Sequence, residues 1–290
     1  MTFDDWTCRA SGLSKIMGKM GITENQEATL ATLDAKTASG KPLTENQKVA
    51  YSLLMTKKLN PELPLTAQTE LRAAWRSAKY NRGFQFTNKY VQKGLAQEEE
   101  AITVLSNTLE RPLFKWKKGR IFGKYLQGMP DVVEHEAGFD TKCAWNLRTF
   151  PFPGDDLESD YEWQNQAYMK LCDKEVWYTA KVLVNTTERL LYNEKMKWFY
   201  QLGSPDVGTE EFAEYEIQAK EVEKDMIFDY ARFQNHYPHH VLLHTPDEWI
   251  YDIPVEDRIV FLKSERNEQM IKEAEERVVI CRKYLNELSR

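Results

Sequence analysis

The sequence contains little cysteine and no long apolar stretch. Four cysteines occur in 290 residues, and none has the C-x-x-C spacing of a zinc module. They are Cys8, Cys143, Cys172 and Cys281. A disulfide scaffold is not indicated either, so reduced thiols are the simpler interpretation. No apolar run approaches the roughly 18 residues of a membrane span, and the acidic start "MTFDDWTCRA" lacks the pattern of a signal peptide. We therefore expect a soluble, cytoplasmic protein with no membrane partner.

Low-complexity linkers and internal repeats are also missing from the sequence. With 42% hydrophobic and 29% charged side chains in 290 residues, the chain can bury a substantial core. This composition excludes a disordered chain. It predicts one large domain, or a domain with an appended helical part.

An overall excess of positive charge, which would favour a nucleic-acid partner, is absent because the net charge is −6. The charges are unevenly distributed, however. Residues 36–93 contain eleven Lys/Arg and three acids, whereas residues 205–290 contain eleven Lys/Arg and twenty acids. The segment "KWKKGRIFGK" at residues 115–124 adds five basic residues. Local basic surfaces bind phosphate backbones, so DNA or RNA stays open as a partner, although solvated helix faces are the simpler explanation.

Hydrophobic periodicity and capping signals predict helices first, then strands, then helices again. Thr44 followed by Gln47 forms a capping box at the start of one helix. The expected helices cover residues 9–19 (a short one begun by Ser11), 44–59, 66–81, 94–109, 161–172, 210–234 and 267–288. The expected strands cover residues 119–133 and 137–145, paired around a turn, and residues 175–184. This order favours an α/β fold with a central mixed sheet flanked by helices. We expect a single domain in residues 1–290, with a core in about 1–184 and a mostly helical, acidic C-terminal extension in about 185–290.

Residues 128–145, "GMPDVVEHEAGFDTKCAW", hold the most informative polar pattern. Alternate side chains of a strand share a face, so Asp140 and Lys142 project together while Phe139 and Cys143 belong to the core. Asp131 joins them from a neighbouring strand or turn, and the group can hold Mg²⁺, because this cation prefers oxygen ligands. A metal there lowers the pKa of an attacking water and neutralises charge on a phosphate. The pattern therefore fits phosphodiester hydrolysis.

The Asp-x-Lys tripeptide alone is a weak signal. A second copy occurs at Asp34-Ala35-Lys36, in a segment without strand character. An exposed ion pair on an amphipathic strand explains Asp140 and Lys142 equally well.

Two helical features favour the metal site. Glu98 is in line with three apolar residues of its helix, which predicts a partly buried carboxylate that needs a metal, a lysine or another basic partner. These apolar residues are Leu95, Ile102 and Leu105. The alternative is a position in the first helical turn, where negative charge is favoured and solvent is near. Tyr161 and Gln164 share one face of the next helix with Tyr168. There they can position water or phosphate, or be ordinary half-buried side chains.

Four separated motifs, in this order, resemble the PD-(D/E)XK nucleases. Within them the chain is most similar to the branch that contains bacteriophage lambda exonuclease and the YqaJ-like viral recombinases. The motifs are Gly94-x-x-x-Glu98-x-x-Ala101, Pro130-Asp131, Asp140-Thr141-Lys142 and Tyr161-x-x-Gln164-x-Gln166. The resemblance extends from about Ser11 to about Val184, and residues 247–278 also resemble the closing part of phage members. It implies a restriction-endonuclease-like core.

The resemblance implies a role for each matching residue. The metal ligands would be Glu98, Asp131, Asp140 and the main-chain carbonyl of Thr141. The metal would be Mg²⁺, with Mn²⁺ also suited to oxygen ligands, and two ions are expected. Lys142 would activate or orient the attacking water. From the helix, Gln164 and Tyr161 would organise the site.

A binding site for a terminal phosphate is also implied. Ser11 matches a serine that lies near the 5′-phosphate of the substrate in relatives. The arginine that accompanies it seven positions earlier is missing, because Asp4 stands there. Arg9 or Arg82 would have to replace it, so a 5′-phosphate requirement stays open.

The implied function is a Mg²⁺-dependent DNA exonuclease. It would digest one strand of linear double-stranded DNA from the 5′ end and leave a 3′ overhang for a single-strand annealing protein, in phage-type recombination or repair. Relatives form ring-shaped trimers around DNA, so a homo-oligomer is expected. The setting would be the cytoplasm, as a phage or prophage protein in a bacterial host.

Alternatives from other classes have their own signals. A Cas4-like nuclease with an iron-sulfur cluster needs three clustered C-terminal cysteines, and only Cys281 is there. Another PD-(D/E)XK endonuclease or exonuclease, or a non-catalytic DNA-binding recombination partner, fits the same motifs. A histidine cluster offers a metal site in principle, but ordinary loop chemistry explains it better. Its members are His236, His239, His240 and His244.

Overall fold

Seven strands form two sheets in the part of the chain that the computed structural model describes, residues 1–83 and 87–290. The strands are β1 (Cys8–Arg9), β2 (Ile121–Phe122), β3 (Leu126–Gly128), β4 (Val132–Val133), β5 (Gly138–Cys143), β6 (Val176–Val182) and β7 (Ile259–Glu265). The smaller sheet has the order β1-β3-β2 and the larger one β4-β5-β6-β7. β5 and β6 run parallel, whereas β4 and β7 pair antiparallel at the two edges. The prediction of an α/β fold with a mixed sheet is confirmed.

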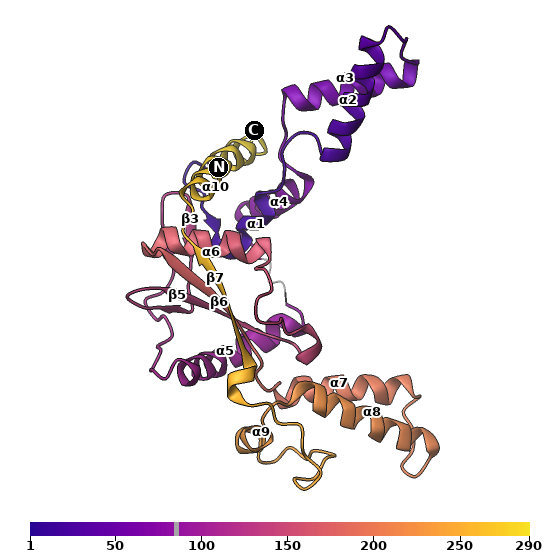
Figure 1. Cartoon of the computed structure of the whole chain (residues 1–290), viewed down its shortest axis with the longest axis vertical. Coiled ribbons are helices and arrows are strands. Elements are labelled where there is room, and N and C mark those ends of the chain that lie inside the picture. The colour runs from indigo at the N-terminus through magenta and orange to yellow at the C-terminus, as the bar shows by residue number, and fades with distance from the viewer. Residues whose placement is uncertain (84–86) are drawn as a thin grey trace.

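Helices surround the larger sheet (Figure 1). The α-helices are α1 (Leu13–Ile16), α2 (Glu24–Ala38), α3 (Glu45–Leu59), α4 (Leu65–Tyr80), α5 (Lys89–Thr108), α6 (Ser159–Cys172), α7 (Glu188–Gln201), α8 (Glu210–Met226), α9 (Tyr230–His236) and α10 (Glu268–Glu287). Short 3-10 turns cover Ala10–Gly12, Leu147–Thr149 and Val255–Arg258. The capping box of Thr44 and Gln47 begins α3 as predicted, and Thr23 with Gln26 makes the same box at the start of α2.

α5 and α6 cover opposite faces of the larger sheet (Figure 1). Phe139 and Ala180 pack with Leu105 of α5 on one face. On the other face Trp177 packs with Met169 of α6, and α10 closes the same cluster. Burial of one such side chain is worth about 1.5–3 kcal/mol, so these two layers fix the strands that carry the polar motifs.

Gly138 at the start of β5 permits a close approach of the core. A Cβ atom there would lie 2.1 Å from the indole of Trp177. Any larger residue would displace the indole, so the glycine lets β5 and β6 pair while Trp177 fills the space beside α6.

Two expectations about strands are wrong. Residues 119–133 form three short strands, because the main chain turns at Gly123, whose N–H donates to the Leu126 carbonyl, and again at Pro130, which has no N–H to donate. The mostly helical C-terminal extension is present, but it also contains a strand that we did not expect, β7. All seven of its residues pair with β6, so the sheet of the core includes a strand from beyond residue 184.

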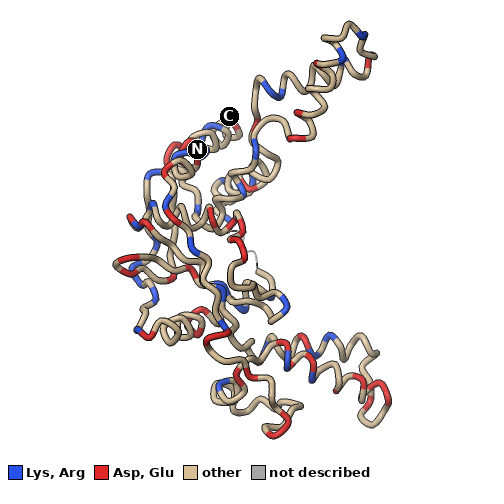
Figure 2. The backbone as a smooth tube through the Cα atoms, in the orientation of Figure 1, with Lys and Arg blue, Asp and Glu red and all other residues tan. Residues whose placement is uncertain are grey.

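Two helical hairpins project from opposite ends of the body (Figure 1). α2 and α3 meet through a small cluster around Leu30 and Leu54. α7 and α8 meet around Leu191 and Met226. Acidic residues gather toward the far end of the α7–α8 hairpin (Figure 2). Among the described residues, no helix is both long and apolar enough to cross a bilayer.

Candidate active site

Side chains from several segments line one cavity of about 400 Å³ beside β5. The predicted site residues among them come from α5, the turn before β4, β5 itself and α6. They are Glu98, Asp131, Thr141, Lys142 and Tyr161. The fold thus brings together residues that are up to 63 positions apart in the sequence.

Asp131 is fixed by the pairing of β4 with β5. Val132 lies opposite Phe139 in the antiparallel register, which places the preceding aspartate beside Thr141. One carboxylate oxygen, Oδ2, accepts hydrogen bonds from the Thr141 main-chain N–H at 2.7 Å and from its hydroxyl at 2.8 Å. Burial nevertheless raises the pKa of Asp131 above its ordinary value, so the carboxylate lacks full compensation for its negative charge.

Asp140 is almost completely buried, with 2% of its surface exposed. Its Oδ1 accepts a hydrogen bond of 3.1 Å from the side-chain amide of Gln164, and its Oδ2 lies 2.6 Å from the Lys142 ammonium. Burial raises the pKa of Asp140 to about 6, although Lys142 acts in the opposite direction. Burial alone would lower the pKa of Lys142, but Asp140 and Asp131 raise it above its ordinary value. Lys142 is therefore a cation in this arrangement.

Glu98 lies in the middle of α5, because this helix begins at Lys89 and not at residue 94. The alternative of a first-turn position is therefore wrong. The prediction that Leu95 shares its buried stripe is also wrong, since Leu95 is 73% exposed while Ile102 is buried. A basic partner for Glu98 was expected, and Lys115 provides it at 3.1 Å.

Tyr161 lies between two lysine side chains. The Lys142 Nζ atom is 5.3 Å from the centre of the ring and the Lys181 Nζ atom is 4.1 Å from it. Lys181 lines the same cavity but was not among the predicted site residues. The only local signal was its position on an expected strand, because it reaches the site through the parallel register that pairs it with Lys142.

Two other polar residues of α6 have distinct positions. Tyr168 receives a hydrogen bond from Gln164 at 3.4 Å and donates one to the Met129 carbonyl at 3.1 Å, so it supports the side chain that holds Asp140. Gln166 points away from the cavity. Its amide donates to the Glu265 carbonyl and accepts from the Asn267 N–H, which joins α6 to the connection between β7 and α10.

Ser11 lies in the 3-10 turn before α1 and lines a cavity of about 310 Å³ together with Tyr161 and Gln164. Ser11 also lines a smaller cavity, of about 180 Å³, together with Arg9 and Arg120. Arg82 follows the end of α4 and, among the described residues, lines none of the cavities that contain Ser11. Of the two predicted arginines, the structure brings only Arg9 to Ser11.

The donor chemistry at the cavity fits a hard divalent cation. Asp140 Oδ2 is buried and, despite its contact with Lys142, has no partner in hydrogen-bond geometry. Glu98, Asp131 and Asp140 supply the carboxylate oxygens that Mg²⁺ and Mn²⁺ prefer. Within residues 1–83 and 87–290, no three His, Cys, Asp or Glu side chains lie close enough together to form a metal centre as they stand. Because Lys142 and Lys115 contact two of the carboxylates, a cation has to compete with these ammonium groups.

The other candidate metal sites receive no support. Cys8 and Cys281 belong to one hydrophobic cluster, Cys172 packs against it and Cys143 packs against another, and in the described part of the chain no three His, Cys, Asp or Glu side chains are placed to bind a metal ion. Among the histidines, His244 is buried against Glu223 at 2.8 Å, and the His236 ring bonds to the Arg232 carbonyl. Such contacts are typical of histidine side chains with a structural role.

Lys93, which we counted in the basic region of the sequence, is buried in α5 and cannot lie on a DNA-binding surface. It is 1% exposed and donates a hydrogen bond of 2.9 Å to the Trp145 carbonyl. Its ammonium also lies 5.3 Å from the centre of the Phe228 ring. Burial lowers the pKa of Lys93 to about 7. In the described part of the chain no carboxylate forms a salt bridge with it, which explains the direction of the change.

The lowered pKa of Lys93 predicts that the free energy of unfolding increases with pH. The unfolded chain holds the lysine proton up to about pH 10.4, whereas the folded chain releases it near pH 7. Between these values the unfolded state binds more protons, so the free energy of unfolding increases as the pH rises. From pH 7.5 to 9.5 we expect Lys93 to contribute a gain of about 2 kcal/mol. Urea unfolding at both pH values measures this gain, and Lys93→Met is expected to remove it.

The matched control is Lys41→Met, which changes an exposed lysine in the connection between α2 and α3. It is expected to leave the pH dependence of the wild type intact. Equal pH dependences for wild type and Lys93→Met would contradict the assignment.

The chain was compared with known proteins by sequence and by structure, and only the comparison of structures found matches. No family model matches the sequence, and no curated protein matches it. Among solved structures, the chain is similar to a phage-related exonuclease from Haemophilus somnus 129PT, with a TM-score of 0.58 and 20% identity over 98% of this chain and 95% of that chain. An alkaline exonuclease (LHK-Exo) from Laribacter hongkongensis overlaps at a TM-score of 0.44 and 12% identity, over 98% of this chain and 89% of that chain. The first likeness confirms the fold that the sequence motifs implied.

Proposed function

We propose that this chain is a metal-dependent deoxyribonuclease that removes nucleotides from the ends of linear double-stranded DNA. The observation that carries the proposal is the convergence of Glu98, Asp131 and Lys142 on one cavity, with Asp140 buried behind it. A surface ion pair would need none of this organisation. The fold that the chain shares with a phage-related exonuclease supports the same assignment.

The resemblance of the four sequence motifs suggests a role for each residue. The ligands of Mg²⁺ or Mn²⁺, with two ions expected, would be Glu98, Asp131, Asp140 and the Thr141 carbonyl. When bound, the metal lowers the pKa of the attacking water and neutralises charge that develops on the phosphate. Lys142 would activate or orient the attacking water. Gln164 holds Asp140 in place through Oδ1.

The proposed direction of digestion is 5′ to 3′, with a phosphate-binding site at Ser11. Its support is the location of Ser11 beside Tyr161 and Gln164, next to the catalytic cavity. Arg9 and Arg120, which line the smaller cavity together with Ser11, supply the positive charge that a phosphate needs. Glu158 and Asp160 line the first of these cavities and oppose such binding, so the arginine side of Ser11 is the better location.

The product and its partners complete the proposal. The 3′ overhang would pass to a single-strand annealing protein during phage-type recombination or repair in a bacterial cytoplasm, and three copies of the chain would enclose the DNA as a ring. This part rests on the resemblance of the four sequence motifs.

Degradation of an end-labelled linear duplex tests the proposed function. With Mg²⁺ we expect mononucleotides to be released from the 5′ end, faster when that end carries a phosphate, and we expect no release with EDTA. A closed circular duplex of the same sequence is the matched substrate and should stay intact. Cleavage of the circle would indicate an endonuclease, and no cleavage of either substrate with Mg²⁺ or Mn²⁺ would overturn the assignment.

A further inference from the structure

The end of the loop between α5 and β2, with β2 and the turn after it, carries exposed aromatic rings among basic residues. Residues 114–124 contain five Lys/Arg and no acid. They are Lys115, Lys117, Lys118, Arg120 and Lys124. Phe114 is 75% exposed and Phe122 is 70% exposed, so neither ring contributes much to the core. Exposed rings next to lysines are the combination that binds unpaired bases and their phosphates.

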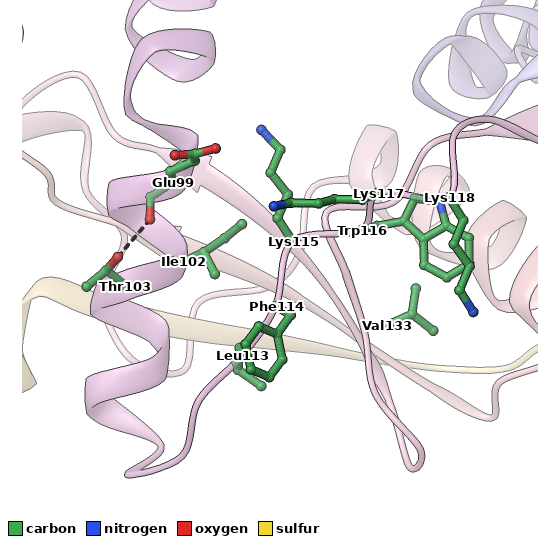
Figure 3. A pocket seen from close by; sticks show the side chains of 10 residues that line it. All are labelled: Glu99, Ile102, Thr103, Leu113, Phe114, Lys115, Trp116, Lys117, Lys118 and Val133. Atoms are coloured by element: carbon green, nitrogen blue, oxygen red, sulfur yellow. Dashed lines mark hydrogen bonds between the residues drawn. The ribbon is translucent and has the colours of Figure 1, made fainter.

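This loop borders a second cavity, of about 560 Å³ (Figure 3). Phe114, Trp116, Lys117 and Lys118 line it from the loop, and α5 closes the other side. The indole of Trp116 donates a hydrogen bond of 2.7 Å to the Gly119 carbonyl, which holds the loop. The Lys118 Nζ atom lies 5.2 Å from the centre of the same indole. The cavity therefore has an aromatic wall held by a hydrogen bond and cationic side chains beside it.

The second cavity adjoins the catalytic cavity. The Trp116 N–H donates to the Asp131 carbonyl at 2.7 Å, and Lys115 contacts Glu98 across the boundary. On α5, Leu95 lines the catalytic cavity and Ile102 lines the second one. These two positions are about 10 Å apart along the helix axis, a distance that an unpaired strand spans with a few nucleotides. A strand with one phosphate at Asp131 can thus reach the loop.

We propose that Phe114, Lys117 and Lys118 form a binding site for unpaired nucleotides of a DNA strand that enters or leaves the catalytic centre. The inference rests on the proposed function for the identity of the nucleic acid. Bases in the interior of a duplex already stack on both neighbours, so an unpaired base is the better partner for the Phe114 ring. The lysines complement phosphates, and the sole acid that lines this cavity among the described residues is Glu99.

Binding of two DNA ends, measured by fluorescence anisotropy in EDTA, tests this site without requiring cleavage. One end is blunt and the other is a fork with six unpaired nucleotides on each strand. The wild-type chain is expected to bind the fork more tightly. Phe114→Ala is expected to weaken fork binding by about 5- to 100-fold, which corresponds to the loss of one base–aromatic stack. Binding of the blunt end should change little.

The double variant Lys117→Gln/Lys118→Gln probes the phosphate contacts. Each phosphate contact on a single strand contributes about 0.7 to the slope of log affinity against log salt concentration, so the slope should fall by about 1.4. The matched controls are Lys272→Gln/Lys283→Gln on the exposed face of α10 and Tyr200→Ala at the end of α7. Both are expected to bind the fork as the wild type does.

Three results would overturn the inference. They are equal affinity of the wild type for fork and blunt end, unchanged fork binding in both loop variants, and an equal loss of blunt-end binding in these variants. The second result would leave an acidic protein as the partner of the loop. Because no cleavage is measured, a chain that binds the fork as expected but does not degrade DNA would contradict only the proposed function.

Discussion

Lys142→Ala is expected to lower the rate of DNA degradation by about 10²- to 10⁴-fold, because a positioned charged group at the reacting centre is worth this much. Asp131→Asn is expected to have an effect of at least the same size, since it removes a carboxylate that lines the catalytic cavity. The rate of nucleotide release from a linear duplex under single-turnover conditions measures both. DNA binding should persist in both variants, because the loss concerns the chemical step.

The second Asp-x-Lys sequence supplies the matched control for this experiment. Lys36 follows Asp34 with the same spacing, but both lie on α2, where Lys36 bonds to Gln47. Lys36→Ala should therefore degrade DNA at the wild-type rate. Thermal unfolding of Lys142→Ala shows whether the loss reflects folding, and Asp131→Asn, which keeps the shape of the side chain, provides the independent variant. Wild-type rates in both site variants would show that the acids are structural and that the chain is a non-catalytic DNA-binding protein.

Glu223→Ala is expected to lower the free energy of unfolding by about 3–5 kcal/mol, because it leaves a buried lysine without its counter-charge. Glu223 is fully buried in α8 and forms an ion pair with Lys195 of α7. Its carboxylate also accepts hydrogen bonds from the Leu243 N–H at 2.7 Å and from the His244 N–H at 3.0 Å. One side chain thus joins two helices to the segment that follows α9. Urea unfolding at pH 7 measures the loss.

The pH dependence gives a second readout for Glu223. Burial alone would raise its pKa, but Lys195 and the hydrogen bonds lower it below the ordinary value. The stabilisation is therefore complete above about pH 4.3, the ordinary value for glutamate, and is lost as the pH falls through the lower pKa of the folded chain. Glu216→Ala, on the exposed side of the same helix, is the matched control and should change stability by about 0.5 kcal/mol or less. Similar stabilities for the two variants would contradict this role.

Much of the scaffold could be predicted because its signals are local. Thr44 with Gln47 marks the start of α3, and the alternation of Phe139, Asp140 and Cys143 marks a strand with a core face and a polar face. The confirmed mixed sheet follows from the order of such elements. By contrast, β7 was missed although Ile259, Val260 and Phe261 have strand character. The segments around it suggested helices, and its pairing with β6, about 80 residues earlier, has no signal in the sequence.

The partners of the site residues could not be predicted for the same reason. Lys115 reaches Glu98 because the chain returns along α5 after the helix ends, and Lys181 reaches Tyr161 because β5 and β6 are in parallel register. The residues of each contact are far apart in the sequence, and no motif links them. For Lys93 the error was of another kind, because a position on a basic surface was predicted and the side chain is buried. It belongs to a basic segment by composition, yet Trp145 and Phe228 from distant segments cover it.

Anomalous diffraction from crystals soaked in Mn²⁺ tests the central claim most directly, namely that Asp131 and Asp140 belong to one metal site. We expect a peak at about 2.0–2.3 Å from a carboxylate oxygen of each residue, with the Lys142 ammonium displaced from Asp140. Glu98 and the Thr141 carbonyl should complete the site. A peak elsewhere, or no peak while Lys142 stays in contact with Asp140, would contradict the account.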